Sequence, residues 1–151
     1  KSKKMIGNTA IDQHLKRADS LFDSVAWFEA NDTLVKTTIL DLIRIKQLTE
    51  QGIDENQNII GQYSAVTDML TNGDKAEGDN FTLDDTGHFY RSMFVTVLKD
   101  SILIDADYNK MTDQNWWTID ILGLTDKNLE IYAQMVKQNF IRYARRILQI
   151  N

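Results

Sequence analysis

The chain has 151 residues, 42% hydrophobic and 26% charged, which is the balance of one globular domain with a buried core and excludes a disordered chain. Its net charge of −5 argues against a general nucleic-acid binder, because neutralising phosphates requires clustered Lys and Arg. The absence of cysteine excludes disulfides, thiolate metal ligands and a thiol nucleophile.

Residues 1–8 are predicted to form a flexible basic tail, because Lys1-Ser-Lys-Lys4 precedes the first helical pattern. The chain begins at Lys1 rather than Met, so we expect processing, trimming or further residues upstream. This end carries no apolar signal region. No apolar run approaches the roughly 18–20 residues that span a bilayer, so no membrane partner is expected.

Two long N-terminal helices are predicted from apolar residues spaced three and four apart. The first begins at Asn8 or Thr9, the second ends near Gly52, and no proline interrupts them. The same spacing suits one long kinked helix, but a break at residues 30–32 is favoured, because Asn and Asp compete for local backbone hydrogen bonds. The apolar positions are Ile11, Leu15, Ala18, Phe22, Val25 and Phe28, and then Val35, Ile39, Leu42 and Ile43.

Residues 53–80 differ from the helical segments in composition. The stretch 71–80 reads Thr-Asn-Gly-Asp-Lys-Ala-Glu-Gly-Asp-Asn and is rich in turn-forming and charged residues. We therefore predict that 53–80 is an exposed, mobile loop or arm. Long loops in compact domains are often functional, so this arm is a candidate for docking a partner.

A short helix followed by a β-hairpin is predicted next. Asp84 or Asp85 is expected to cap the helix, which carries Phe89, Tyr90 and Met93. Two runs rich in β-branched residues, 95–98 and 102–105, flank the polar turn at 99–101 and indicate antiparallel strands. Because a two-stranded hairpin is marginally stable alone, it is expected to pack on a helix or pair with another chain.

Trp116 and Trp117 follow in a polar context. One is expected to anchor the loop to the core and the other to lie on an interface, where Trp is enriched.

The clearest helix of the chain is predicted to begin at the N-cap Thr125. Its apolar residues form a narrow stripe, close to a heptad seam. Such a stripe suits a helix packed on its own core and also a contact between subunits, and the sequence leaves both open. Three arginines near the C-terminus fit favourable placement against the helix dipole. The stripe consists of Leu129, Tyr132, Val136, Phe140, Tyr143 and Ile147, and the arginines are Arg142, Arg145 and Arg146.

Together these elements predict a single α+β domain over residues 1–151 that is predominantly helical. It combines long N-terminal helices, a short helix with an antiparallel hairpin, and a long C-terminal helix.

Asp85-Thr86-Gly87 has the sequence of the catalytic triplet of aspartic proteases. One copy in a chain of this length would require a homodimer in which two aspartates share a proton. However, Asp84 would add a second charge there, and the residues after Gly87 are typical of a helix rather than a strand. We therefore favour a helix start at this position and keep the protease as the rival interpretation.

Metal and nucleophile sites are weakly indicated. Asp54-Glu-Asn-Gln-Asn58 begins like an EF-hand loop, but Ile59 stands where the loop needs Gly and Ala65 where it needs Glu. The run from Asp105 to Asn109 fails at the same two places. The only histidines, His14 and His88, are far apart in sequence, which argues against zinc. No Gly-rich phosphate loop or serine elbow is present, so we expect no cofactor, no metal and no enzymatic activity.

The stretch from Leu83 to Ser92, Leu-Asp-Asp-Thr-Gly-His-Phe-Tyr-Arg-Ser, precedes the two strands and resembles a pattern in tail-completion, or head–tail joining, proteins of tailed phages and prophages. That pattern runs Leu-x-x-Thr-Gly-x-Phe/Leu-x-x-Ser. The upstream segment 52–64 with Thr67 and the downstream segment 120–126 are also similar to members of this family. The similarity covers roughly residues 40–148.

The resemblance implies a non-enzymatic virion protein that is assembled in the host cytoplasm. Such proteins form homo-oligomeric rings in the neck, contact portal, connector or tail proteins, and meet DNA only as it passes through a lumen. Asp85 belongs to the structural motif, Thr86 and Gly87 would start the short helix, Phe89 would enter the core, and Ser92 would close the helix. A prophage-encoded adaptor protein is a further alternative.

Overall fold

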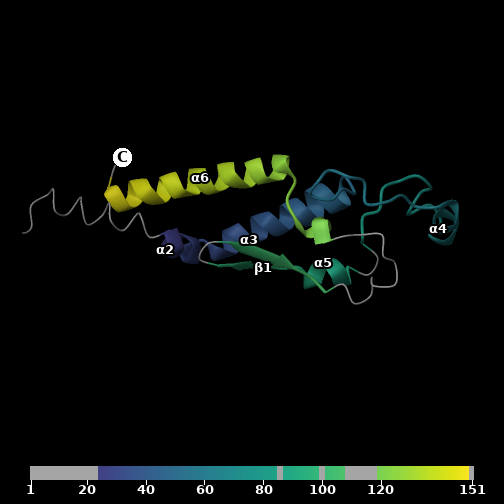
Figure 1. Ribbon diagram of the computed structural model, residues 1–151, viewed down its shortest axis with the longest axis horizontal. Coiled ribbons are helices and arrows are strands. Elements are labelled where there is room, and N and C mark those ends of the chain that lie inside the picture. The colour runs from purple at the N-terminus through teal and green to yellow at the C-terminus, as the bar shows by residue number, and fades with distance from the viewer. Residues whose placement is uncertain (1–23, 85–86, 99–100, 108–118, 150–151) are drawn as a thin grey trace, which may run out of the picture.

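The computed structural model describes residues 24–84, 87–98, 101–107 and 119–149. Within these ranges the chain is an α+β protein, predominantly helical, with one two-stranded antiparallel sheet and a long C-terminal helix, as predicted. The molecule is elongated, and α6 lies along the α3 segment while the hairpin lies on the other side of α3 (Figure 1). The predicted basic tail and most of the first predicted helix fall outside the described residues.

Helix α2 (Ser24–Ala30) and helix α3 (Asp32–Asp41) are separated by a turn at Asn31. The Asn31 side chain donates its Nδ2 proton to the carbonyl of Trp27 at 2.8 Å. The Asn31 side chain thus competes for a backbone carbonyl, which is the reason a break was predicted here. Trp27 is buried and meets Phe28 and Phe140 edge-on, which joins α2 to the C-terminal helix.

A π-helix, η1 (Leu42–Thr49), continues α3. It differs from the uninterrupted α-helix that periodicity predicted. Its wider winding shows in the Glu50 amide, which donates to the carbonyl of Ile45, five residues back, at 2.9 Å. The helical segment ends there, and Gly52 turns the chain with a φ of +62°. Short π-helical segments are frequent at functional sites.

The hairpin consists of β1 (Phe94–Val97) and β2 (Ile102–Asp105). Val95 pairs with Ile104 and Val97 with Ile102 in an antiparallel register. These four side chains face the core, since Val95 is buried and the others pack partly buried against it. Burial of this face against α3 gives the hairpin the helix support that an isolated hairpin lacks.

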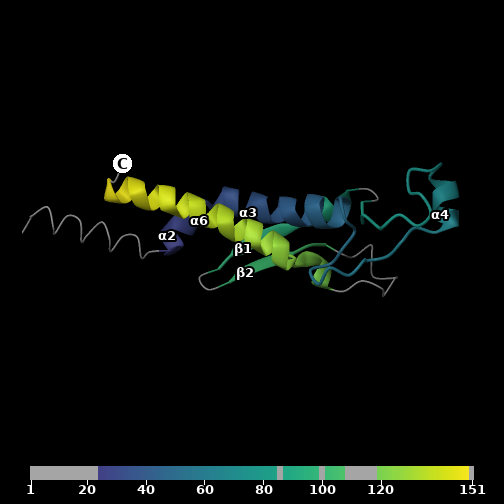
Figure 2. The same cartoon turned by 90° about the horizontal axis from the view of Figure 1, so that it is seen from above.

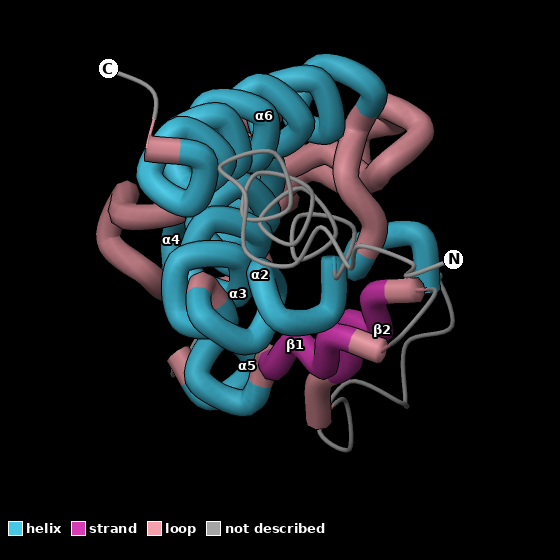
Figure 3. Tube along the Cα trace, turned by 90° about the vertical axis from the view of Figure 1, so that its left-hand side faces the viewer, coloured by secondary structure: helices cyan, strands magenta, loops and turns pink. Residues whose placement is uncertain are grey.

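Helix α6 (Asp126–Leu148) is the longest element. The Thr125 hydroxyl accepts a hydrogen bond from the Asn128 amide at 3.3 Å, so Thr125 is the N-cap, as predicted. Figure 2 shows α6 crossing above α3 and the hairpin, and Figure 3 shows α3 between α6 and the strands. None of the described helices is both long and apolar enough to span a bilayer.

The core lies between α2, α3, η1, the hairpin and the N-terminal half of α6, with α5 (His88–Ser92) and η2 (Ile119–Leu122) closing one end. Its buried apolar members are Trp27, Val35, Ile39, Leu42, Ile43, Leu48, Phe89, Met93, Val95, Ala106, Ile121, Leu122 and Tyr132.

Residues 59–82 leave this body as an arm with helix α4 (Ala65–Leu70) at its tip. The two sides of the arm run antiparallel, with the Tyr63 amide donating to the carbonyl of Asp79 and the Phe81 amide to that of Gly61. The helix at the tip is a correction to the predicted loop. Its start at Ser64, whose hydroxyl accepts from the Thr67 amide, was the available sequence signal.

Candidate functional site

The motif turn places Gly87 before helix α5 (His88–Ser92). Gly87 occupies the N-cap position with a φ of +66°, a left-handed conformation that glycine adopts without strain. The prediction that Asp84 or Asp85 caps this helix is therefore wrong. The N-cap is Gly87, and no side-chain hydrogen bond caps the helix there. Asp85 and Thr86 lie outside the described residues.

The two remaining motif residues hold α5 to the hairpin. Phe89 is buried, with 4% of its surface exposed, and packs in the core cluster. The Ser92 hydroxyl donates to the carbonyl of Phe89 at 2.7 Å and accepts from the amide of Asp107 at 2.9 Å. Ser92 thus links the end of α5 to the chain that leaves β2. His88 lies 3.9 Å from the Asp107 carboxylate on the same side.

The root of the arm is fixed by a chain of hydroxyl groups. The Tyr90 hydroxyl donates to the carbonyl of Thr82 and lies 3.2 Å from the Thr49 hydroxyl at the end of η1. The Tyr63 hydroxyl lies 3.2 Å from that of Thr82 and also accepts from the Thr82 amide. Desolvation raises the pKa of Tyr90 to about 12, so its phenol stays neutral.

Two glycines allow the sides of the arm to approach. A Cβ on Gly52 would stand 2.6 Å from the Cβ of Asn80 and 2.7 Å from the carbonyl oxygen of Phe81. A Cβ on Gly61 would stand 2.3 Å from the Phe81 ring, which packs edge-on to Tyr63 at 4.8 Å. The Asn80 side chain also donates to the carbonyl of Gln51 at 2.8 Å. The arm is therefore attached to the end of η1 along its base.

A buried polar junction connects η1 to the start of α6. The Gln47 side chain is fully buried and accepts from the Thr125 amide at 2.8 Å and from Asn128 Nδ2 at 2.9 Å. Its own Nε2 donates to the carbonyl of Gly123 at 2.9 Å. The two bonds that Gln47 accepts are buried and the bond that it donates is partly buried. In a low-dielectric interior, satisfied polar groups of this kind specify a single arrangement.

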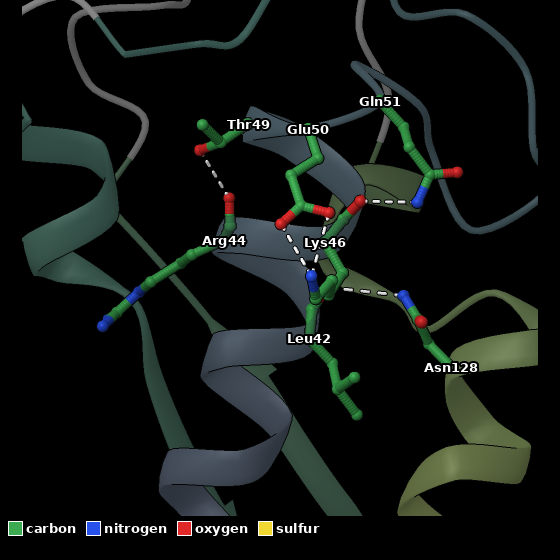
Figure 4. A network of polar contacts seen from close by, with 7 residues as sticks. All are labelled: Leu42, Arg44, Lys46, Thr49, Glu50, Gln51 and Asn128. Atoms are coloured by element: carbon green, nitrogen blue, oxygen red, sulfur yellow. Dashed lines mark hydrogen bonds and ion pairs between the residues drawn. The ribbon is translucent and has the colours of Figure 1, made fainter.

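Further side chains bond to backbone carbonyls of η1, at its surface and on its buried side (Figure 4). The Thr49 hydroxyl donates to the carbonyl of Arg44, and Nε2 of the Gln51 side chain donates to the carbonyl of Lys46, five residues back in each case. Asn128 Nδ2 reaches the carbonyl of Leu42 at 3.4 Å. Side chains thus bond carbonyls along the π-helix, and the junction of η1, the arm and α6 is held on several sides.

The predicted stripe on α6 divides between core and surface. Tyr132 is buried, and Val136, Phe140 and Tyr143 are partly buried against the chain's own core. Ile147 is partly exposed, and Leu129 is 51% exposed. The middle of the stripe therefore packs within the chain. The outward side of α6 carries other residues, among them Lys137, Ile141, Arg142 and Arg145.

The hairpin turns a second apolar surface outward. Phe94, Leu98 and Leu103 are each about half exposed on the side opposite α3. In the described part of the chain, no third strand pairs with either strand. An open two-stranded sheet with an apolar outer face can pair with or pack against another chain.

The segment that begins like an EF-hand loop forms a local turn. The Asp54 carboxylate accepts from the amides of Asn56 and Asn58 at 2.9 and 2.8 Å, a local turn. Desolvation and the nearby Asp120 and Asp54 charges raise the pKa of Glu55. Over the described residues, no three acidic or histidine side chains gather as a metal site would require. Trp116 and Trp117 lie outside these ranges.

Sequence reasoning missed Gln47, Asn128 and Tyr90 as positioning residues. Gln47 falls on the apolar face of the helix between Ile43 and Leu48, and a polar residue in that position was the signal for a buried junction. Asn128 follows the N-cap Thr125 by three residues, where a capping box would place Glu or Gln.

Comparison with known proteins yields no match to a family model, to a curated protein or to a solved structure.

Proposed function

We propose that this chain is a non-enzymatic structural protein of a tailed bacteriophage, which forms part of a homo-oligomeric ring in the neck or tail that joins head or portal to tail. The observation that carries the proposal is the motif 83–92 followed by a hairpin. Its residues have structural tasks, because Gly87 starts α5, Phe89 enters the core and Ser92 bonds to Asp107.

The shape of the molecule supports assembly. Exposed surfaces suited to contacts lie at separate places along an elongated body (Figure 1): apolar side chains at the arm tip and on the outer face of the hairpin, and a basic side of α6 that includes Ile141. In a cyclic ring of three or more subunits, each contact joins one patch of a subunit to a different patch of its neighbour, so every subunit needs two separate patches. The net charge of −5 suits a lumen through which DNA passes without binding.

Purified tailed particles test this proposal directly. Mass spectrometry of particles from a strain that carries the gene should find this chain at a fixed copy number relative to the portal protein. Absence of the chain from complete particles would contradict a virion role and would favour an adaptor that acts in the host.

The aspartic protease remains the rival because the Asp85-Thr86-Gly87 triplet is present. The helix that follows Gly87 and the predominantly helical fold favour the structural role, since the retroviral-type enzymes are nearly all β. Asp85→Asn separates the two. The structural role predicts no pepstatin-sensitive peptidase activity in the parent and an unchanged oligomer in the variant, whereas an activity that Asp85→Asn abolishes would support the enzyme.

A further inference from the structure

The arm tip is the most exposed apolar feature of the described chain. Val66, Met69 and Leu70 on α4 are 61%, 71% and 73% exposed, more than any other large hydrophobic side chain in the described residues. The arm that carries them is held firmly, through Tyr63, Phe81 and the backbone bonds along its sides. A rigid support for exposed apolar side chains lowers the entropy cost of docking.

The tip is acidic as well as apolar. Residues 64–79 contain four acidic residues against one lysine, a net charge of −3. Asp74 and Glu77 are exposed on the turn that follows α4, while the lysine, Lys75, lies over the Tyr63 ring at 5.6 Å. The Asp68 carboxylate accepts from the Glu77 amide and so orders this turn. A complementary surface should therefore combine an apolar side chain with basic groups.

The outward side of the C-terminal half of α6 has this combination. Residues 131–148 carry four basic residues and no acidic residue. Lys137, Ile141 and Arg145 follow each other at four-residue spacing, which places them on one line of the helix, and all three are exposed. The helix dipole accounts for cations in the last turn, but Lys137 and Arg142 lie before it.

The two surfaces cannot meet within one chain. The arm tip and the C-terminal end of α6 lie at opposite ends of the long axis in both perpendicular views (Figures 1 and 2). In the described part of the chain, no salt bridge engages Asp74, Glu77, Lys137 or Arg145. Their complementarity is therefore available to a contact between copies.

We infer that the arm tip of one copy, at Val66, Met69 and Leu70, docks on the line Lys137–Ile141–Arg145 of α6 in a second copy. The contact is head-to-tail, so each copy offers both surfaces and the contact repeats until the ring closes. This inference rests on the proposed ring and names the contact that builds it.

Disulfide trapping tests the contact, because the chain has no cysteine of its own. The double variant Met69→Cys with Ile141→Cys should give, under mild oxidation, a ladder of covalent multimers beyond the dimer. Each single variant should give dimers at most. The matched control pairs Met69→Cys with Leu103→Cys on the outer face of the hairpin and should give no ladder.

A ladder from the Leu103 pair instead would overturn the inference in favour of docking on the sheet. Absence of both ladders in a chain that still forms oligomers would overturn the inference and leave the ring intact. A parent chain that is monomeric would contradict the proposed function itself, so the two failures are distinguishable.

Charge exchange gives an independent measurement. Asp74→Lys with Glu77→Lys should weaken self-association by about tenfold or more, since like charges would then face each other. Adding Lys137→Glu with Arg145→Glu should restore most of the association, because the charges are exchanged rather than removed. Failure of the exchanged chain to recover, with its folding unchanged by circular dichroism, would count against this pairing of surfaces.

Discussion

Gln47 and Asn128 hydrogen-bond to each other through buried side chains, with Asn128 Nδ2 donating to Gln47 Oε1 at 2.9 Å. The Gln47 side chain also accepts from the Thr125 amide and donates to the Gly123 carbonyl. The direction in which α6 leaves the body is therefore set at one point of η1.

Gln47→Met keeps the size of the side chain and removes all three bonds. We expect a loss of about 3 kcal/mol or more in the free energy of unfolding, because buried polar groups lose their partners. Urea unfolding followed by circular dichroism measures it. The control Gln138→Met, at an exposed position of α6, should stay within about 0.5 kcal/mol of the parent. Equal losses would contradict the junction.

Gly52→Ala tests the close approach at the base of the arm. Its Cβ would meet Asn80 and the Phe81 carbonyl, in addition to the strain of a φ of +62°. Gly78→Ala is the matched control, because its φ is +85° but no atom lies within 4 Å of the new Cβ. We expect backbone strain to lower the free energy of unfolding by about 1–2 kcal/mol at either position. At Gly52 the close contacts should lower it by a further 1 kcal/mol or more, roughly. Thermal unfolding of both variants gives the comparison.

The alkaline limb of stability should report on Tyr90. Its folded pKa of about 12 lies above the unfolded value of about 10, so the folded state holds its proton longer. The stability that this neutral phenol contributes is complete below pH 10 and is lost as the pH rises toward 12. Tyr90→Phe should be less stable than the parent at neutral pH, and this difference should shrink over that window. A constant difference would show that Tyr90 does not titrate as described.

Ser92→Ala tests the motif residue that bonds α5 to the chain after β2. Loss of the bonds to Phe89 and Asp107 should cost about 1 kcal/mol of unfolding free energy. Ser101→Ala, at an exposed position next to β2, is the control and should leave stability nearly unchanged. Chemical denaturation distinguishes them, and a neutral Ser92→Ala would remove the structural reason for this serine.

The elements that the sequence predicted are those with local causes. The hairpin follows from β-branched runs around a turn, and α6 from a cap at Thr125 with a clear apolar spacing. The break at Asn31 follows from its own side-chain bond. Each of these depends on residues close together in the chain, so a pattern could reveal it.

The features that escaped prediction depend on distant contacts. The π-helix η1 contains Gln47, and the hydrogen-bond partners of this side chain lie more than seventy residues away in sequence. At the base of the arm, the Tyr90 hydroxyl accepts from Thr49, 41 residues earlier, and the backbone at Phe81 lies against Gly52. Composition therefore predicted an exposed arm at 53–80 but could not reveal how it is attached or that α4 forms its tip.

The apolar stripe of α6 shows the same limit of sequence patterns. An apolar stripe predicts that one side of α6 is covered, but not by what, and the structure covers Tyr132 and Phe140 with the chain's own α2 and core. The opposite side of α6 carries exposed cations, and the C-terminal end of this helix lies at the other end of the molecule from the acidic arm tip (Figure 1).

Native mass spectrometry of the unmodified chain, over a range of concentrations, tests the central proposal most directly. A ring protein should give one closed multimer of fixed copy number, with no series of intermediate sizes growing without limit. A chain that remains monomeric at the highest attainable concentration, or that grows as an open-ended series, would contradict the account.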